Sequence, residues 1–391
     1  MIHSPSGAAT TPVAAPAPYP APDSEPDSAP NPAPDSATGP GPGRDPAVTD
    51  HHGTRPHPAR TNARRLLGLV IALALLVVTI FASILVGARG ISAQTVLESA
   101  FAYTGSTEHL IVWELRVPRT VVGLLVGPAL GLAGGLIQAF TRNPLADPGI
   151  LGVNAGAGFF VTIAVGILGI SNPLGYVWFA LAGAAVATVL VYVIGSAGRG
   201  QATPIRLTLA GVALAAVLGG IATAITLKNP DAFDEMRFWG AGSIGGRDMD
   251  VVAALAPFFI VGIILALAIS RPLNALAMGD DVGRSLGAHV GRTRVVVVVS
   301  VTLLAGAATA LAGPIGFVGL MVPHMVRWIV GPDQRWILAY TLVCAPILLL
   351  VSDILGRVIL PHGELRVGVV TAVVGAPVLI MLARRRNVSA L

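Results

Sequence analysis

Charged residues are scarce in this chain, and lysine is almost missing. Asp, Glu, Lys and Arg make up 12% of the 391 residues, whereas hydrophobic residues make up 54%. An ordinary soluble domain carries about 25% charged residues, so the deficit points to lipid as the solvent of most of the chain. Lys228 is the only lysine, and Leu227 precedes it. A phosphate-binding Gly-x-x-x-x-Gly-Lys-Ser/Thr loop is therefore excluded.

Cysteine and the motifs of membrane enzymes are equally rare. Cys344 is the only cysteine, which excludes a disulfide or a thiolate metal cluster within the chain. We expect it to be a small apolar residue inside a helix. His-Glu-x-x-His, Gly-x-Ser-x-Gly and paired aspartates within apolar segments are also absent. We therefore predict a non-enzymatic protein without a cofactor, metal site or nucleic-acid partner.

Proline is concentrated at the beginning of the chain. Residues 1–58 hold 15 of the 30 prolines, mixed with Ala, Ser, Asp and Gly, without any apolar periodicity. Such a segment cannot bury enough surface to offset its ordering entropy. We predict a disordered cytoplasmic tail over residues 1–64 and a membrane domain over residues 65–391. The first apolar run also lies too far from the start to be a signal peptide.

Long uncharged segments divide the membrane domain, and about twenty apolar residues cross a bilayer as a helix. Four uncharged gaps of 20 to 23 residues lie between Arg65 and Arg89, Arg119 and Arg142, Arg206 and Lys228, and Asp250 and Arg271. A 51-residue gap is divided into two spans by a turn at 171–175, and a 32-residue gap over 295–326 is divided by Gly and Pro at 313–316. The second part of the latter gap gives a short span at about 317–330. Two gaps of 17 residues, 336–352 and 367–383, complete ten predicted spans of an all-α membrane protein.

Basic residues give the orientation of these spans. With ten spans and a cytoplasmic start, inside segments hold fifteen Arg or Lys residues and outside segments hold eight. Without the short span around Pro323, the arginines at 384–386 would face outward, against the positive-inside rule. We therefore predict a multi-pass protein of the cell membrane with both termini in the cytoplasm. Gly127, Gly131 and Gly135, four residues apart, indicate close helix packing.

The inside loop over residues 271–294 contains two short amphipathic stretches, with turns at Gly279 and Gly287. Its apolar residues are Leu273, Leu276, Val282, Leu286 and Val290. Apolar contacts on otherwise polar helices favour docking onto a soluble partner. The alternative is a helix that lies on the lipid headgroups.

Several blocks of residues follow one another in a distinctive order. They are Leu115-Arg116-Val117-Pro118-Arg119, Gln138, Arg142-Asn143-Pro144-Leu145-Ala146-Asp147-Pro148, Leu151 to Ala157, Leu209-Ala210-Gly211, Trp239 with Gly242-Ser243, Gly313 to Leu320 with Pro323-His324 and Arg327, Asp353 with Arg357, and Gly375-Ala376-Pro377. Over about residues 66–386 the chain thereby resembles the FecCD family. Members of this family are permease subunits of binding-protein-dependent ABC importers for ferric siderophores, haem and vitamin B12.

The resemblance implies a channel of two permease subunits, driven by two cytoplasmic ATPases and fed by an extracytoplasmic binding protein. Residues 142–157 look closest to ferric-siderophore permeases, with cobalamin or haem permeases as the alternative. The resemblance further implies three sets of functional residues. These are binding-protein docking by Arg116, Arg119 and Arg357, ATPase coupling by Leu276, Gly279, Asp280, Arg284, Leu286 and Gly287, and a channel or gate with Gln138, Asn143, Pro144, Asn154 and His324.

Alternatives exist for some of these roles. Arg116 and Arg119 would also serve as headgroup anchors of their helix, and His324, beside a proline, would also satisfy a freed backbone carbonyl. An ion-coupled secondary transporter is a second class of function, but it commonly needs acidic residues inside its spans. Here Asp353 falls near the outer end of its span. One residue departs from the family pattern, because Arg366 replaces the proline of Glu-Leu-Pro-Val-Gly.

Overall fold

Helices form the regular structure of the residues that the computed structural model describes, namely 58–87, 89–197, 203–285, 287, 289–360 and 363–384. No strand occurs among these residues. The first helix, α1, begins at Pro58, so residues 58–64 of the predicted tail are helical. The rest of the predicted tail lies outside the described residues.

Among the residues that the structure describes, ten apolar helices correspond to the ten predicted spans. Seven are long enough to cross a membrane: α1 (Pro58–Leu85), α4 (Val117–Thr141), α6 (Pro173–Ser196), α7 (Pro204–Lys228), α9 (Met249–Ala268), α12 (Val290–Ala312) and α14 (Gln334–Val358). Three are shorter: α5 (Val153–Gly166), α13 (Val318–Val330) and α15 (Val367–Arg384). A break separates α12 from α13 at the predicted 313–316, and another separates α5 from α6. The latter break covers 167–172, so residues 173–175 of the predicted turn instead form the start of α6. Cys344 lies half-buried inside α14, as expected.

Proline and a capping side chain start two of these spans and the connecting helix α8 (Pro230–Gly240) in the same way. The side chains of Asn172, Thr203 and Asn229 accept hydrogen bonds from backbone N–H groups in the first turns of α6, α7 and α8. A proline follows each cap directly, at a position whose N–H has no partner within a helix. The turn residues between apolar runs therefore define where these helices begin.

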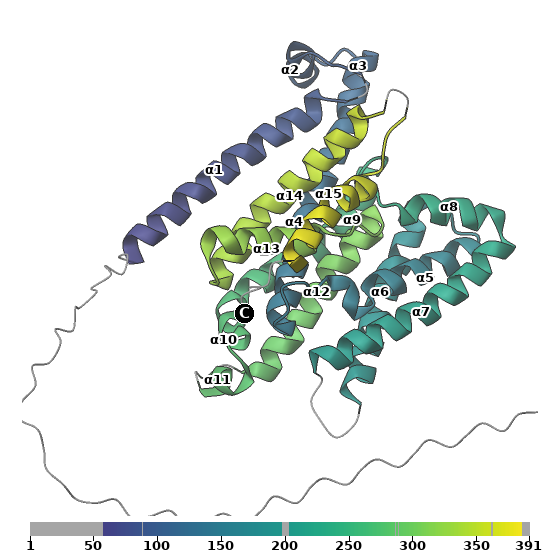
Figure 1. Cartoon of the computed structure of the whole chain (residues 1–391). Helices are drawn as coiled ribbons and strands as arrows, with labels where there is room; N and C mark the ends of the chain where they lie inside the picture. The colour runs from purple at the N-terminus through teal and green to yellow at the C-terminus, as the bar shows by residue number, and fades with distance from the viewer. Residues whose placement is uncertain are drawn as a thin grey trace, which may run out of the picture. The chain divides into compact units, whose positions relative to one another are not determined.

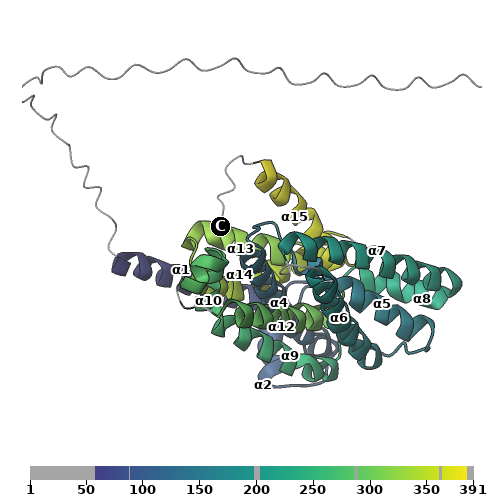
Figure 2. The ribbon, with the colours of Figure 1, turned by 90° about the horizontal axis from the view of Figure 1, so that it is seen from below.

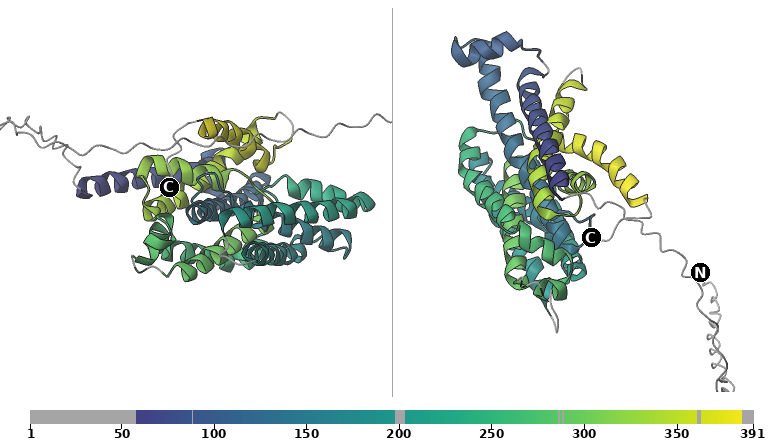
Figure 3. Two further views of the ribbon diagram at one scale, coloured as in Figure 1. Left: turned by 60° about the horizontal axis from the view of Figure 1, so that its bottom comes forward. Right: turned by 90° about the vertical axis from the view of Figure 1, so that its left-hand side faces the viewer.

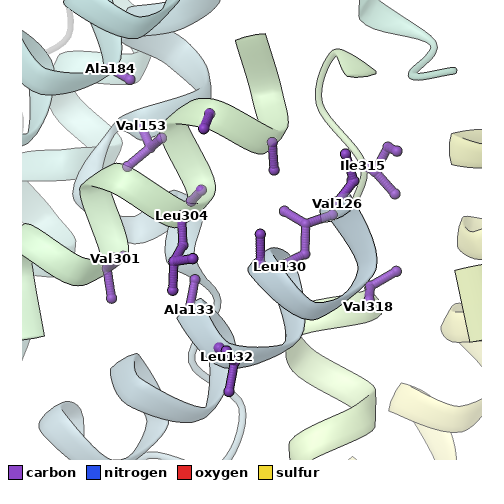
Figure 4. Packing of buried hydrophobic residues seen from close by; sticks show 14 of the residues in the cluster. Val126, Leu130, Leu132, Ala133, Val153, Ala184, Val301, Leu304, Ile315 and Val318 are labelled. Carbon is purple, nitrogen blue, oxygen red and sulfur yellow. The ribbon is translucent and has the colours of Figure 1, made fainter. Parts of the chain in front are cut away.

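Helix α4 is the centre of the bundle and packs against α9, α12, α13 and α14. A Cβ atom on Gly127 would lie 2.6 Å from Cα of Pro346, and one on Gly131 would lie 2.7 Å from Cβ of Ala345. The predicted glycine spacing therefore lets α4 and α14 approach closely. Figure 4 shows Leu130 and Ala133 of α4 in one apolar cluster with Leu304 of α12.

The connecting helices gather at the two ends of the bundle. One end, which we call the outer end after the predicted orientation, carries α2 (Ala93–Phe101), α3 (Thr107–Leu110) and the π-helix η1 (Ile111–Arg116). The opposite, inner end carries α10 (Ser270–Ala277) and α11 (Asp280–Ser285) (Figure 1). A 3₁₀ turn, η2 (Pro148–Leu151), leads into α5.

Four helices lie at the periphery of the bundle. Figure 2 shows α1 on one side, with α7 and α8 on the other. Helix α15 packs against α13 and α14 and then diverges from the bundle (Figure 3). Because these helices are only partly covered within one chain, they leave apolar side chains for lipid or for other proteins.

Candidate functional site

The structure brings the three predicted docking arginines together at the outer end. Nη2 of Arg119 lies 2.7 Å from Oε2 of Glu364, and Nη1 lies 3.9 Å from Oδ2 of Asp353. Nε of Arg357 lies 3.0 Å from the same Asp353 oxygen. Together with Arg116, these residues form what we call the outer charge cluster. Its three arginines and two carboxylates leave one positive charge in excess.

Two arginines of this cluster bind the carboxyl end of α1. Nη1 of Arg116 donates to the carbonyls of Ile84 and Leu85, at 2.6 and 2.7 Å. Nη1 of Arg357 donates to the carbonyls of Ser83 and Val86, at 3.0 and 2.8 Å. The last carbonyls of a helix have no partners within it. The two guanidinium groups therefore cap α1 and join it to α4 and α14.

The three arginines differ in how far they are exposed to solvent. Arg116 and Arg357 are 5% and 3% exposed, whereas the side chains of Arg119 and Glu364 are 16% and 42% exposed. The ion pair between Arg119 and Glu364 is therefore the part of the cluster that a partner reaches most easily. The family resemblance implied one role for the three arginines, but their acceptors on α1 are backbone carbonyls, which leave no signal in the sequence.

At the inner end, the predicted pair of short helices is present as α10 and α11. Gly279 and Gly287 have φ angles of +116° and +78°, which glycine adopts at little cost. The two turns therefore lie where the sequence predicted them. Leu286, one of the predicted coupling residues, lies outside the described residues.

An ion network links this connector to the rest of the inner end. Oδ1 of Asp280 lies 2.7 Å from Nη2 of Arg142, and Oδ2 of Asp280 lies 2.5 Å from Nη2 of Arg294. Nε of Arg142 also donates to the carbonyl of Leu276 at 3.3 Å. We call Arg142, Asp280 and Arg294 the inner charge cluster. It borders a pocket of about 620 Å³, which Met278 and Val282 also line.

Helix α10 turns its apolar side toward the bundle. Leu273 and Leu276 are buried, so the predicted coupling residue Leu276 anchors α10 within this chain. Nδ2 of Asn274 donates to Oδ1 of Asp333 at 2.9 Å, and Oδ1 of Asn274 accepts from the backbone N–H of Gln334 at 2.7 Å. Burial alone would raise the pKa of Asp333, but hydrogen bonds from Arg335 and Asn274 hold it below its ordinary value.

The exposed surface of the connector is small and mixed in character. Met278 and Val282 are exposed apolar residues, while Asp281 and Arg284 form an exposed ion pair at 3.3 Å. Arg284 was predicted as a coupling residue. The surface left for a partner therefore centres on α11 and not on the apolar side of α10.

The predicted channel residues belong to α4, α5 and α13 and to the segment after α4. Gln138 is fully buried, and its Nε2 donates to the carbonyls of Gly319 and Leu320 at 3.3 and 3.0 Å, which ties α4 to α13. Asn143 is exposed in the segment after α4, and its Oδ1 accepts from the backbone N–H of Leu145. Pro144 is half-buried beside it.

Asn154 and His324 lie in different surroundings. Oδ1 of Asn154 accepts from the Thr309 hydroxyl at 2.8 Å, and Asn154 lines a groove of about 310 Å³ between α5, α7 and α8. His324 packs edge-on against Trp328, with 5.0 Å between the ring centroids. Its Nδ1 has no hydrogen-bond partner among the described residues. Of the predicted channel residues, Asn154 therefore faces an open groove and His324 does not.

Comparison with known proteins identifies the family. Residues 75–385 match the FecCD transport family. The ferric enterobactin transport system permease protein FepD of Escherichia coli K12 is 50% identical over 84% of this chain and 97% of its own length. The probable siderophore transport system permease protein YfiZ of Bacillus subtilis 168 is 40% identical over 81% and 95%. A solved metal-chelate type ABC transporter, in an inward-facing conformation, superposes with a TM-score of 0.71 and 25% identity over 83% of this chain and 99% of its own.

These relatives are transport permeases and not enzymes. The ten apolar helices agree with that class, which confirms the predicted fold. The chain therefore belongs to the FecCD transport family and is a multi-pass membrane permease.

Proposed function

We propose that this chain forms half of the channel of an ABC importer that carries a ferric siderophore into the cytoplasm. The observation that carries the proposal is the similarity to FepD, which extends over 97% of that protein at 50% identity. Relatives named for ferric citrate and ferric hydroxamate import are 40% and 39% identical. Iron chelates are thus favoured over cobalamin or haem as the transported compound.

A second permease subunit is expected to cover α7. Both α1 and α7 are poorly buried in one chain and expose large apolar side chains, Leu209 and Val212 among those of α7, but α7 in addition exposes small residues in its middle. Helix α1 exposes large side chains such as Leu66, Val70 and Phe81, which suit lipid. The small residues of α7 include Ala216 and Gly220, and a Cβ atom added at Gly220 would have no neighbouring atom within 4 Å outside its own helix. Small residues allow another helix to approach closely within a membrane, so α7 is the better candidate for the subunit interface.

The partner at the inner end is a cytoplasmic ATPase that contacts α11. The exposed surface of Met278, Asp281, Val282 and Arg284 offers it one apolar patch between two charges. A charge placed at Val282 would enter that patch without changing either glycine turn. We expect V282E to lower co-purification of the ATPase, while normal co-purification and normal transport would contradict this contact.

The partner at the outer end is the binding protein, and Arg119 is its principal contact in the outer charge cluster. Glu364 already pairs with Arg119, so an incoming carboxylate has to share or replace that pair. Charge pairs at such interfaces act strongly on association rates. The orientation of the ends, and with it the cytoplasmic position of both termini, is part of this proposal.

Uptake of ⁵⁵Fe-labelled siderophores by a deletion strain tests the transported class directly. The strain carries the chain, or an empty vector, together with the partner subunits, and it receives catecholate, hydroxamate and citrate chelates of iron, and labelled cobalamin and haem, in separate assays. Restored uptake of at least one ferric chelate supports the proposal. Restored uptake of cobalamin or haem alone would overturn it.

A further inference from the structure

The residue that departs from the family pattern, Arg366, contacts an aromatic ring at the outer end. Its Cζ atom lies 4.9 Å from the ring centroid of Phe238 on α8. Cζ of Arg237 lies 4.7 Å from the same centroid. Two guanidinium groups therefore share one phenyl ring, although they repel each other.

The positive charge around this ring is only partly neutralised. Arg237 pairs with Asp234 at 3.2 Å, but no carboxylate of the described residues forms an ion pair with Arg366. Arg247 donates to the Tyr176 hydroxyl at 3.3 Å. Burial and then the charge of Arg247 lower the pKa of Arg366, while Glu235 acts in the opposite direction. Guanidinium groups nevertheless remain protonated in proteins.

Phe238 is also open to a ligand. It is 47% exposed, although it lies on a helix that borders the groove described above, which Met236 of α8 lines together with Asn154, Phe159 and Thr223. An exposed ring flanked by cations provides a flat apolar surface and positive charge at one place. Arginine stacks on aromatic groups and binds oxyanions, so this combination suits a ligand that is both aromatic and negatively charged.

Ferric siderophores differ in these two properties. Three doubly deprotonated catecholates around iron(III) give a complex with a net charge of minus three and aryl rings on its outside. Three hydroxamates around the same ion give a neutral complex without a required ring. Only the first class matches both the charge and the ring.

We propose that Arg237, Phe238 and Arg366 form a receiving site for an anionic, aryl-bearing iron(III) chelate of the catecholate class. The inference rests on the proposed function, because it names the cargo class and the place where the cargo first contacts the permease. The site consists of two residues of α8 and the residue just before α15, at the outer end of the bundle. A chelate released at the outer end would contact the exposed ring there.

The test is binding to the assembled importer in nanodiscs of uncharged lipid. The probes are a ⁵⁵Fe-labelled ferric tris-catecholate siderophore and a ferric tris-hydroxamate siderophore, measured by equilibrium dialysis. The variants are R366Q, F238L and R366P, the last of which supplies the proline expected at this position. K228Q is the matched control, since Lys228 is an exposed cation at the outer end of α7 with no place in the proposed site.

We expect R366Q and F238L each to weaken catecholate binding about fivefold, as loss of one cation–π contact predicts. R366P should do the same, while hydroxamate binding and the K228Q control stay at the wild-type level. Equal weakening of catecholate and hydroxamate binding would indicate a packing defect. Catecholate binding at the wild-type level in all three variants would show that these residues do not bind the chelate. Either result overturns the inference. Uptake by wild-type proteoliposomes is measured in parallel. Failure to import any ferric chelate there would overturn the proposed function, independently of the variants.

Discussion

The outer and inner charge clusters are built from the same residue types but hold different parts of the molecule. In the outer cluster, Arg116 and Arg357 are buried and bind backbone carbonyls at the end of a membrane helix. In the inner cluster, Arg142 and Asp280 are partly exposed and join two connecting segments. The outer cluster therefore fixes a helix within the bundle, whereas the inner cluster fixes connectors relative to each other.

Burial also gives the two clusters different energies. Removing one partner of a buried ion pair costs about 3 to 5 kcal/mol, because the other charge stays buried without compensation. An exposed pair contributes about 0.2 to 1 kcal/mol. Connectors held by weak, exposed pairs can separate when a partner binds. We therefore expect stability to depend on the outer cluster and coupling to depend on the inner one.

The largest effect is expected at Arg357. R357A removes the cap on Ser83 and Val86 and leaves Asp353 with its more distant partner Arg119. We expect a loss of about 3 kcal/mol in the stability of the purified permease, measured as thermal unfolding by tryptophan fluorescence. R89Q is the control, because the Arg89 side chain is exposed and its carbonyl remains available to Arg116. If R357A unfolds at the same temperature as the wild type but no longer binds the binding protein, then capping of α1 is not the main role of Arg357.

A smaller effect on a different property is expected at Arg119. R119Q should slow association of the binding protein, most clearly at low salt, and should change thermal stability less than R357A does. E364Q tests the internal pair separately, since it removes the closer carboxylate partner of Arg119 and leaves only Asp353, at 3.9 Å. We expect E364Q to associate at least as fast as the wild type. Equal slowing in both variants would show that the ion pair, and not Arg119 alone, is the contact.

The membrane helices and the turns between them were predictable because lipid imposes them. A span needs an uncharged length, and the breaks at 171–175 and 313–316 consist of residues that end helices. Gly279 and Gly287 were predicted as turns, and their positive φ angles explain why glycine is present. These features are determined by residues that are close together in the chain, so they can be predicted from the sequence.

The contacts within the two clusters were not predictable in the same way. Asp280 binds Arg142, which lies 138 residues earlier in the chain, and neither residue indicates the other. The amphipathic pattern of α10 predicted an apolar face, but it could not tell whether Leu276 meets a partner or the bundle. The role of Arg366 also depended on the fold, since its ring partner Phe238 belongs to a different connector.

The smallest stability effect and the clearest effect on coupling are expected at Asp280. D280N keeps the size of the side chain but removes the charge that holds Arg142 and Arg294. Because these groups are partly exposed, we expect a stability loss of about 1 kcal/mol or less. The segment after α4 and the connector α10–α11 would then move independently, so ATP hydrolysis should continue while transport per ATP falls. D250N is the control, because Asp250 is an exposed carboxylate in the first turn of α9 and belongs neither to a charge cluster nor to the proposed ATPase surface. Transport and ATPase activity are measured together in proteoliposomes for both variants. An unchanged ratio in D280N, or the same fall in D250N, would show that the inner charge cluster does not couple the two segments.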